Sequence, residues 1–406
     1  MRRKGGRGMS EWKKVKLGEV CDTQYGFTAS TVQQDTGTQF LRITDIVPQL
    51  IDWNTVPYCQ IQEKDREKYL LHKGDIVVAR TGATVGYAKY IKEDVPAVFA
   101  SYLVRLLVNS IDVDRHYVGL CVESNLFKEY IQSISNGSAQ PNANAQMISS
   151  FEINLPPLST QHRIATILSR YDSLIENYQK QIKLLEEAAQ RLYKEWFVDL
   201  HFPGHENTNI VDGVPEGWEK KPVKTIIELQ SGYAFKSSAF MEDGIYKIVT
   251  IKNVKDGAFD GENVSKIASI PEKMPKHCIL EDGDILLSLT GNVGRVCIVN
   301  GKNYLLNQRV AKLKSAYKAY TYCLFRSRDM FIEVNNLANG AAQQNVSPIR
   351  IGEMKILIPE KKWLDDFERT VSNYILGIIT LQSQIRFLTE ARDRLLPKLM
   401  SGEIAV

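Results

Sequence analysis

This chain of 406 residues lacks the sequence signals of disulfide frameworks, zinc sites, membrane spans and export. Its 6 cysteines are scattered and form no CxxC pair, which argues against a zinc knuckle or a disulfide framework and predicts reduced thiols, mostly in the core. No apolar run approaches the roughly 18 residues of a membrane-spanning helix. The basic N-terminus MRRKGGRGMS is not followed by the apolar segment of an export signal. We therefore expect a cytoplasmic protein.

Motifs for nucleotides, cofactors and metals are missing as well. The chain contains neither the P-loop pattern GxxxxGK[ST] nor a GxGxxG sequence that opens a helix. In HFPGHE, His201 and His205 lie close together in the sequence. However, Pro203 and Gly204 preclude the helical geometry of an HExxH zinc site, so we interpret this segment as a linker. We predict that this chain has no catalytic residues, binds no metal and holds no cofactor.

The composition is typical of a globular protein with more than one domain. With 44% hydrophobic and 24% charged residues, the chain is long enough for at least two domains of about 100 to 200 residues each. Its net charge of +4 is compatible with a polyanionic partner and equally with a simple role in solubility. The basic residues at positions 1–8 suggest an arm that contacts phosphates. The interpretation we prefer is a disordered leader, or a start upstream of the real one at Met9.

An internal repeat organises the sequence. The segment GDIVVARTGATVG (74–86) recurs about 200 residues later as GDILLSLTGNVG (283–294). At a similar spacing, NGSAQPN (136–142) recurs as NGAAQQN (339–345), and Trp12 near the start of the first copy has a counterpart at the start of the second. The spacing drifts slightly between landmarks, which indicates small insertions in loops. We infer an old duplication whose copies have diverged.

The turn between residues 74 and 86 resembles a phosphate cradle at first sight. After Gly82 and Gly291, however, the chain returns to apolar, β-favouring residues (VGYAKYI and VGRVCIV) rather than opening a helix. This pattern predicts a β-hairpin in each copy. Other short apolar runs predict further strands, and NLFKEYIQSI (125–134) and TYCLFRSRDMFIEVNNL (321–337) predict short helices, so each domain belongs to the α+β class.

Each copy ends in a long segment with apolar residues at alternating steps of four and three, the spacing of a coiled-coil seam. The first segment follows LPPLST, in which Ser159 or Thr160 is expected to cap the helix. The seam residues are Ile164, Leu168, Tyr171, Ile175, Tyr178, Ile182, Leu185, Ala189, Leu192 and Trp196 in the first copy, and Phe367, Val371, Tyr374, Ile378, Leu381, Ile385, Leu388, Leu395 and Leu399 in the second. Arg392 interrupts the second seam where the first has Ala189.

The two seams most simply pair with each other, and a globular copy between them allows the helices to run antiparallel. A helix of about 36 residues is roughly 54 Å long, so we expect a globular domain at each end of a rod. The alternative is two ordinary helices, each packed on its own domain. The predicted organisation is a first domain at 1–158, a helical spacer at 159–199, a second domain at 200–360, and a second helical spacer with a C-terminal tail at 361–406.

Polar loops provide the remaining candidates for function. Asparagine and glutamine can pair with adenine edges, and small neighbouring residues permit close approach of the backbone to DNA. Basic residues beside the turns can hold phosphates. The alternative is a set of turn-rich loops that satisfy their own backbone, with solvated charges nearby. The DNA-binding candidates are Arg80, Thr81, Lys89, Asn136, Gln140, Asn142, Asn144, Lys252, Lys255, Arg295, Gln343, Gln344 and Asn345.

Across nearly its whole length, the chain resembles the DNA-specificity subunits of type I restriction-modification enzymes. The resemblance rests on the paired tryptophans, the two GDI segments, NGSAQPN, LPPLSTQHRIATIL and the C-terminal LLPKLMSGEI. It implies two target recognition domains, each of which recognises half of a bipartite DNA site, and two antiparallel helices that set their separation. It further implies partner methyltransferase subunits that bind S-adenosylmethionine, and a restriction subunit that uses ATP, with Mg expected on the partners.

Some features depart from the resemblance or leave alternatives open. The second copy has PEKKWLDDF where the first has a proline pair before its helix, so the signal that marks the start of the first helix is absent there. The basic leader lies outside the resemblance. A self-sufficient methyltransferase or nuclease is one rival interpretation, and the missing cofactor motifs argue against it. A coiled-coil tether that spaces two protein-binding domains is the other.

Overall fold

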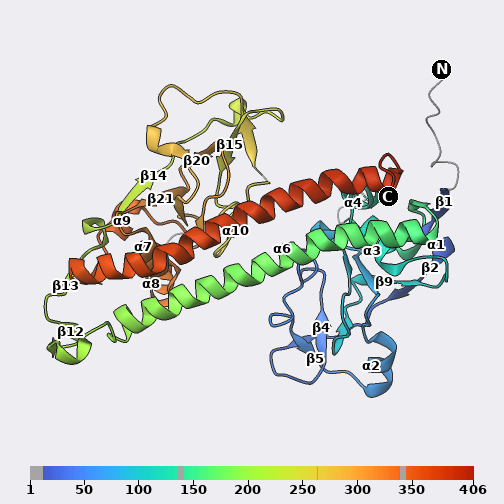
Figure 1. Ribbon diagram of the computed structural model, residues 1–406, viewed down its shortest axis with the longest axis horizontal. Coiled ribbons are helices and arrows are strands. Elements are labelled where there is room, and N and C mark those ends of the chain that lie inside the picture. The colour runs from blue at the N-terminus through green and yellow to red at the C-terminus, as the bar shows by residue number, and fades with distance from the viewer. Residues whose placement is uncertain (1–11, 136–140, 263, 339–343) are drawn as a thin grey trace. The chain divides into compact units, whose positions relative to one another are not determined.

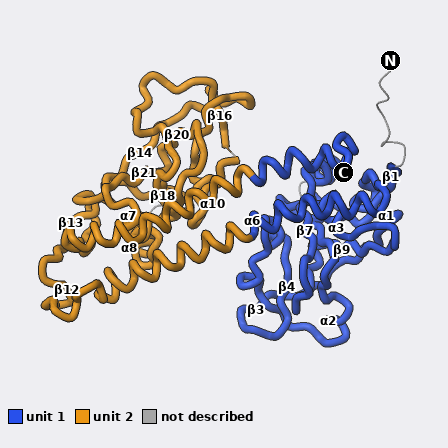
Figure 2. Tube along the Cα trace, in the orientation of Figure 1, with its two compact units in different colours: residues 1–176, 388–406 blue, residues 177–387 orange. Residues whose placement is uncertain are grey.

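The computed structural model describes residues 12–135, 141–262, 264–338 and 344–406. The chain divides into two compact units, one made of residues 1–176 and 388–406 and the other of residues 177–387 (Figure 2). We call them unit 1 and unit 2. This division by contacts cuts through both long helical segments, so each unit contains one globular part and a portion of each long helix.

Unit 1 contains two four-stranded sheets. The first has the order β2-β9-β6-β7 and is antiparallel throughout, and the second has the order β3-β5-β4-β8, in which β4 and β8 are parallel. Figure 1 labels β2 and β9 of the first sheet and β4 and β5 of the second. A further antiparallel pair joins β1 to β10. The strands are β1 (Lys13–Lys16), β2 (Cys21–Tyr25), β3 (Thr31–Val32), β4 (Gln39–Leu41), β5 (Tyr58–Cys59), β6 (Ile76–Ala79), β7 (Ala88–Tyr90), β8 (Ala97–Phe99), β9 (Leu103–Val108) and β10 (Glu152–Leu155). The short helices are α1 (Leu17–Val20), α2 (Glu63–Tyr69), α3 (Arg115–Val122), α4 (Asn125–Ser135) and α5 (Ala145–Ser149).

Unit 2 repeats this plan. Its sheets have the orders β14-β21-β18-β19 and β16-β15-β20-β17, with β15 and β20 parallel, and β13 pairs with β22. The strands are β13 (Glu219–Pro222), β14 (Glu228–Ser231), β15 (Tyr246–Val249), β16 (Ser265–Ile267), β17 (Ile279–Leu280), β18 (Ile285–Ser288), β19 (Val296–Ile298), β20 (Tyr304–Leu306), β21 (Val310–Lys314) and β22 (Lys355–Ile358). The short helices are α7 (Lys318–Arg326), α8 (Arg328–Ala338) and α9 (Pro348–Gly352). An extra hairpin of β11 (Ile210–Val211) and β12 (Val214–Pro215) precedes them.

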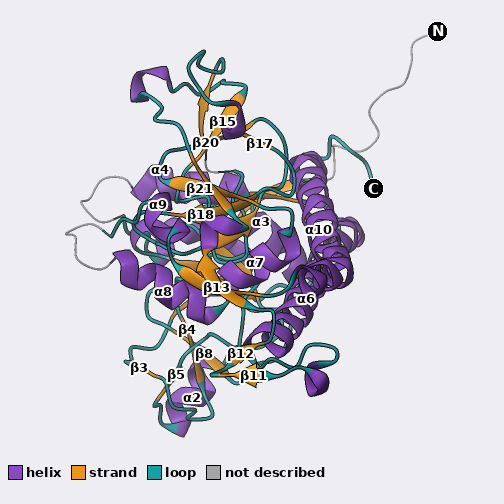
Figure 3. Cartoon of the chain, turned by 90° about the vertical axis from the view of Figure 1, so that its left-hand side faces the viewer, coloured by secondary structure: helices purple, strands orange, loops and turns teal. Residues whose placement is uncertain are grey.

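The matching topologies confirm the internal repeat and the α+β class (Figure 3). The segment predicted as one helix at 321–337 is two helices, α7 and α8, because Ser327 adopts extended backbone between them. All six cysteines are free, as the scattered spacing predicts, and all six are buried. Burial raises the pKa of Cys21 to about 12, so this thiol stays protonated at neutral pH.

Successive side chains of a strand point to opposite faces of its sheet, and this alternation explains how each sheet forms a core. In β6, Ile76 and Val78 face one apolar cluster with α3 and α4, whereas Val77 and Ala79 face a second cluster with β4 and β8. The strand is therefore apolar on both faces, which is typical of a strand buried between two layers. β18 has the same arrangement in unit 2.

The long helices are α6 (Leu158–Tyr193), which continues as a single π-helical turn at Lys194–Val198, and α10 (Lys361–Ser401). In unit 1, Ile164 and Leu168 near the start of α6 share a core with Leu399 near the end of α10. In unit 2, Trp196 near the end of the α6 segment lies edge-on to Phe367 near the start of α10, with ring centroids 5.7 Å apart. The two helices therefore run antiparallel within each unit.

The predicted cap of α6 is wrong. Ser159 and Thr160 lie inside the helix, which begins at Leu158. The carbonyl of Pro157 accepts the backbone N–H groups of Thr160 (2.8 Å) and Gln161 (3.1 Å), so the proline fixes the first turn instead of preceding a hydroxyl cap. The second long helix begins at Lys361.

The seam residues are buried or half-buried, and none is fully exposed. Arg392 does not leave a gap in the seam. Its guanidinium pairs with Asp172 of α6 at 2.8 Å and with Asp393 at 2.9 Å. The long arginine stem can cover apolar surface while its charge is neutralised, which explains how the helix pair tolerates this residue.

Candidate nucleic-acid interface

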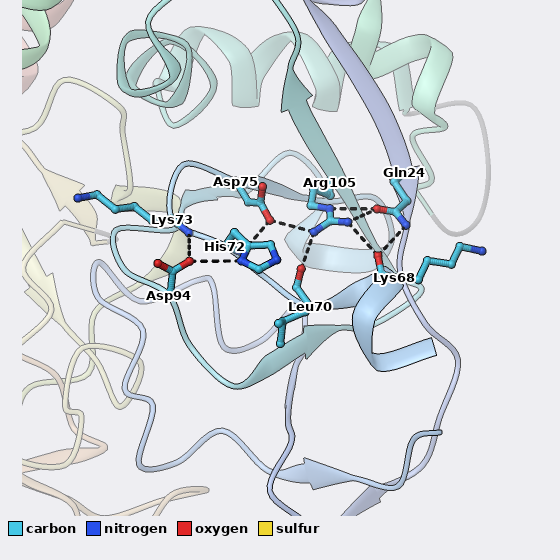
Figure 4. A network of polar contacts seen from close by, with 8 residues as sticks. All are labelled: Gln24, Lys68, Leu70, His72, Lys73, Asp75, Asp94 and Arg105. Carbon is cyan, nitrogen blue, oxygen red and sulfur yellow. Dashed lines mark hydrogen bonds and ion pairs between the residues drawn. The ribbon is translucent and has the colours of Figure 1, made fainter. Parts of the chain in front are cut away.

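The base of the first hairpin is held by a buried ion pair. Asp75 at the start of β6 pairs with Arg105 on β9 at 2.9 Å, and the two side chains are only 6% and 7% exposed (Figure 4). The same Asp75 oxygen accepts the backbone N–H of His72 at 3.0 Å. Arg105 also donates to the carbonyls of Leu70 (2.7 Å) and Lys68 (3.1 Å). The aspartate of the GDI motif thus has a structural role.

The second hairpin is built in the same way with a different cation. Asp284 accepts the backbone N–H of Glu281 at 2.9 Å and pairs with Lys312 on β21 at 2.8 Å. The preceding residues Gly74 and Gly283 have φ values of 97° and 83°, a conformation that favours glycine. These features explain the recurrence of Gly-Asp in both copies without a bound phosphate.

The phosphate-cradle interpretation is therefore rejected in favour of the predicted hairpin. β6 and β7 pair antiparallel around a single 3-10 turn at Gly82–Thr84. β18 and β19 pair in the same way in unit 2. No helix follows either turn, so the backbone N–H groups of a helix N-terminus are not available for a nucleotide phosphate there.

The tip of each hairpin pairs with the Asn/Gln loop of its own copy. In unit 1, Gly82 donates to the carbonyl of Pro141 at 3.0 Å, Ala143 donates to the carbonyl of Arg80 at 2.7 Å, and Thr81 forms an antiparallel bridge with Asn142. We call residues 80–84 together with 141–145 the first tip. The structure thus brings together two motifs that are about 60 residues apart in sequence, in an antiparallel pairing of the kind found in sheets.

Unit 2 has the equivalent second tip, residues 289–293 with 344–347. Gly291 donates to the carbonyl of Gln344 at 3.0 Å, and Val346 donates to that of Leu289 at 3.0 Å. Thr290 forms the bridge with Asn345, and its hydroxyl also donates to the Asn345 side-chain oxygen at 3.0 Å. Gln344 and Asn345 are exposed.

Several side chains differ between the two tips, and Arg80 is the one that is charged. Arg80 in the first copy corresponds to Leu289 in the second, because each immediately precedes the bridging threonine. The Arg80 guanidinium lies over the ring of Tyr25, with its carbon 4.9 Å from the ring centroid, and donates to the Asn142 side-chain oxygen at 3.3 Å. Sequence analysis did not identify Tyr25, which ends β2 far from the tip in sequence.

Another predicted DNA-binding residue, Asn144, has a structural role at the start of a helix. Asn144 is the N-cap of α5, and its side-chain oxygen accepts the backbone N–H of Met147 at 2.8 Å. Ser347 has the same role for α9. The Asn144 side-chain oxygen therefore satisfies the backbone of α5, and the contact of this residue with a base stays a prediction.

Lys89 also differs from its predicted place beside the turn. It pairs with Val77 in the middle of the hairpin, and its ammonium donates to the carbonyl of Gln49 at 3.0 Å. Burial lowers the pKa of Lys89, and the nearby Glu123 carboxylate opposes that effect. The Lys89 ammonium thus already has a hydrogen-bond partner within unit 1, and its contact with a phosphate stays a prediction.

The remaining basic candidates lie in unit 2. Lys252 and Lys255 are exposed in the segment that follows β15, and Arg295 is half-buried between Gly294 and the start of β19 at Val296. Asn136, Gln140 and Gln343 lie outside the described residues. The structure therefore brings Arg80, Thr81 and Asn142 together, and Gln344 with Asn345. Ile251, which directly precedes Lys252, lies against Gly291 of the second tip.

Within the described ranges, no group of three or more histidine, cysteine or acidic side chains is arranged to hold a metal ion. None of the helices in that part of the chain combines the length and apolar character needed to cross a membrane.

Comparison with known proteins identifies the family. The family model for the type I restriction modification DNA specificity domain matches residues 9–187 and 215–371, one match for each copy of the repeat. The chain belongs to this family. The two matches confirm the predicted resemblance, and they begin close to the two tryptophans that mark the copies.

Relatives in this family are similar over most of their length. The type I restriction enzyme MjaIX specificity subunit of Methanocaldococcus jannaschii is 28% identical over 345 residues, covering 82% of this chain and 78% of the relative. The HindI specificity subunit of Haemophilus influenzae is 21% identical over 471 residues, covering 98% and 100%. The crystal structure of the type I S subunit from M. genitalium matches with a TM-score of 0.57 at 15% identity, covering 98% of each chain, and supports the same fold.

Proposed function

We propose that this chain recognises a bipartite, asymmetric DNA sequence as the specificity subunit of a type I restriction-modification complex. The globular part of each unit recognises one half of the site, and the paired helices α6 and α10 set the spacing between the halves. The chain itself is non-catalytic. Partner methyltransferase subunits bring S-adenosylmethionine to methylate adenine N6, and a restriction subunit brings ATP and Mg.

The single observation that carries this proposal is the pair of equivalent hairpin tips with different side chains. Each tip joins a rigid hairpin to an Asn/Gln loop through the same backbone bonds. Rigid elements that present a few polar side chains suit direct contact with base edges. The first tip carries Arg80 and the second carries Leu289 at the equivalent position, which supports two different half-sites.

Exposed apolar residues on the long helices support docking of partner subunits. Leu184 on α6 and Phe387 on α10 are 64% and 57% exposed. They occupy equivalent positions of the repeat, one residue before Leu185 and Leu388 in the two seams. Apolar side chains held outside a seam on both helices suit two copies of the same partner. We infer that they anchor the two methyltransferase subunits.

Replacement of Leu184 or Phe387 by lysine is expected to weaken assembly with the methyltransferase subunits by about 2 kcal/mol per site, the usual effect of removing an apolar anchor. The stability of the chain itself should barely change, because both side chains are exposed. Sedimentation of the mixed subunits measures the stoichiometry. Lys183→Glu is the matched control, since it changes a neighbouring charge on the same helix. Assembly of either lysine variant with unchanged affinity would contradict the docking role.

The rival function is a coiled-coil tether with two protein-binding domains, and salt dependence of DNA affinity separates the two. A complex that contacts several phosphates releases counterions, so its affinity for duplex DNA falls steeply as salt increases, by roughly 10³ between 50 and 200 mM for about six contacts. We expect such a fall for the assembled complex on DNA of the source genome. Affinity that is negligible at low salt would favour the tether.

A further inference from the structure

We propose that Tyr25 is a positioning residue that holds Arg80 for contact with a guanine in the half-site recognised by unit 1. This inference rests on the proposed function and extends it to one base. It concerns the first tip alone, because the second tip has Leu289 where the first has Arg80.

Three contacts fix the Arg80 side chain and its platform. The guanidinium carbon lies 4.9 Å from the centroid of the Tyr25 ring, within the range of a cation–π contact. The Tyr25 hydroxyl accepts the backbone N–H of Ala145 at 3.0 Å, which ties the ring to the Asn/Gln loop. One Arg80 Nη atom donates to the Asn142 side-chain oxygen at 3.3 Å. The side chain is thus held between the loop and the end of β2.

The unused donors of Arg80 define what it can bind. Its Nε atom is buried and has no hydrogen-bond partner in the part of the chain that the structure describes, so the outer edge of the guanidinium, with its two Nη groups, is the edge that can meet a ligand. The end of a planar guanidinium matches the paired acceptors O6 and N7 of guanine in the major groove. Tyr25 is 44% exposed and Arg80 is half-buried over its ring, so the pair lies at the surface of unit 1.

A DNA phosphate can also accept two arginine N–H groups. Comparison of the two copies favours guanine over phosphate as the ligand of Arg80. Contacts that hold the DNA backbone are needed in both copies, because each domain must be positioned on the same kind of duplex. The bridging threonines Thr81 and Thr290 are present in both tips, whereas Arg80 is not. The two tips share their backbone bonds and their bridging threonine but differ in several side chains, of which Arg80 is the charged one. A charged side chain present in only one tip suits a sequence-dependent contact, which differs between half-sites.

The test is selection of randomised DNA duplexes by the assembled complex, followed by counting of the bound sequences. The wild-type complex should select a guanine at one position of one half-site. Arg80→Ala should reduce that preference by roughly 5- to 100-fold while the other half-site is still selected. Tyr25→Ala should lower the same preference, and Tyr25→Phe should restore it, because phenylalanine keeps the ring beneath the guanidinium.

Arg115→Ala is the matched control. Arg115 is an exposed arginine of the same unit whose side chain lies against Gly74, at the opposite end of β6, so the guanine preference should be unchanged. If a variant still selects the half-site recognised by unit 2, its chain is folded and assembled.

The outcomes separate this inference from the proposed function. A selective wild-type complex whose base preferences survive Arg80→Ala overturns the guanine contact. An Arg80→Ala variant that binds all DNA sequences equally more weakly overturns the guanine contact too, because loss of a phosphate contact has that effect. Loss of preference in Tyr25→Phe equal to that in Tyr25→Ala overturns the role of the ring. A wild-type complex that selects no sequence contradicts the proposed function itself.

Discussion

Replacement of Asp75 by alanine is expected to destabilise unit 1 by about 3–5 kcal/mol, since it leaves the buried guanidinium of Arg105 without its counter-charge. The two side chains are 6% and 7% exposed, so water cannot replace the lost carboxylate. The substitution also removes the acceptor for the backbone N–H of His72 at the base of the hairpin. Hydrogen exchange of the β6 and β9 amides measures the effect locally.

Two further variants test whether the unpaired buried charge causes the loss of stability in Asp75→Ala. Asp284→Ala in unit 2 should cost less, because Asp284 and Lys312 are 11% and 14% exposed and water can partly solvate the lysine that remains. The double variant Asp75→Ala with Arg105→Met should recover much of the loss, because it leaves no unpaired buried charge. An Asp75→Ala variant as stable as wild type would show that the ion pair does not hold the hairpin.

Insertion of one heptad into both α6 and α10 is expected to lengthen the gap between the two half-sites of the recognised DNA sequence without abolishing recognition. Seven residues after Glu176 and seven after Phe387 would keep the apolar seam in phase, since the seam repeats every seven residues. They would lengthen each helix by about 10 Å, which corresponds to about three base pairs at 3.4 Å each. The unread gap of the methylated motif should grow by that amount while both half-sites stay the same.

The control for this insertion separates helix length from chain length. Seven flexible residues inserted between Asp212 and Gly213, in the turn of the β11–β12 hairpin, should leave the gap unchanged. A gap of unchanged length in the double-helix insertion, with both half-sites still methylated, would show that the helices do not set the spacing.

The features that sequence analysis predicted correctly are periodic or repeated. The antiparallel helices and the duplicated hairpins follow from apolar spacing and from motifs that occur twice, and both signals are local in the sequence. The buried positions Ile164 and Phe367 could be named for that reason. α6 begins at Leu158, before the cap expected at Ser159 or Thr160, because the Pro157 carbonyl accepts the first N–H groups of the helix.

The contacts that sequence analysis missed join residues far apart in the chain. Tyr25 meets Arg80 only because β2 and β6 both pair with β9 in one sheet, and no local pattern marks the tyrosine. Arg392 was taken for a break in the seam because its partner Asp172 lies in the other helix. Composition alone likewise did not show that Asn144 caps a helix and that Asn142 faces Arg80. Strand order and helix pairing decide these roles.

The most direct test of the central claim is a map of methylated adenines in the source genome with and without this gene. Deletion should abolish methylation at one bipartite motif with two different half-sites and an unread gap, and restoring the gene should return it. Unchanged methylation at every motif after deletion, or the loss of a single continuous motif, would contradict recognition of a bipartite site by this chain.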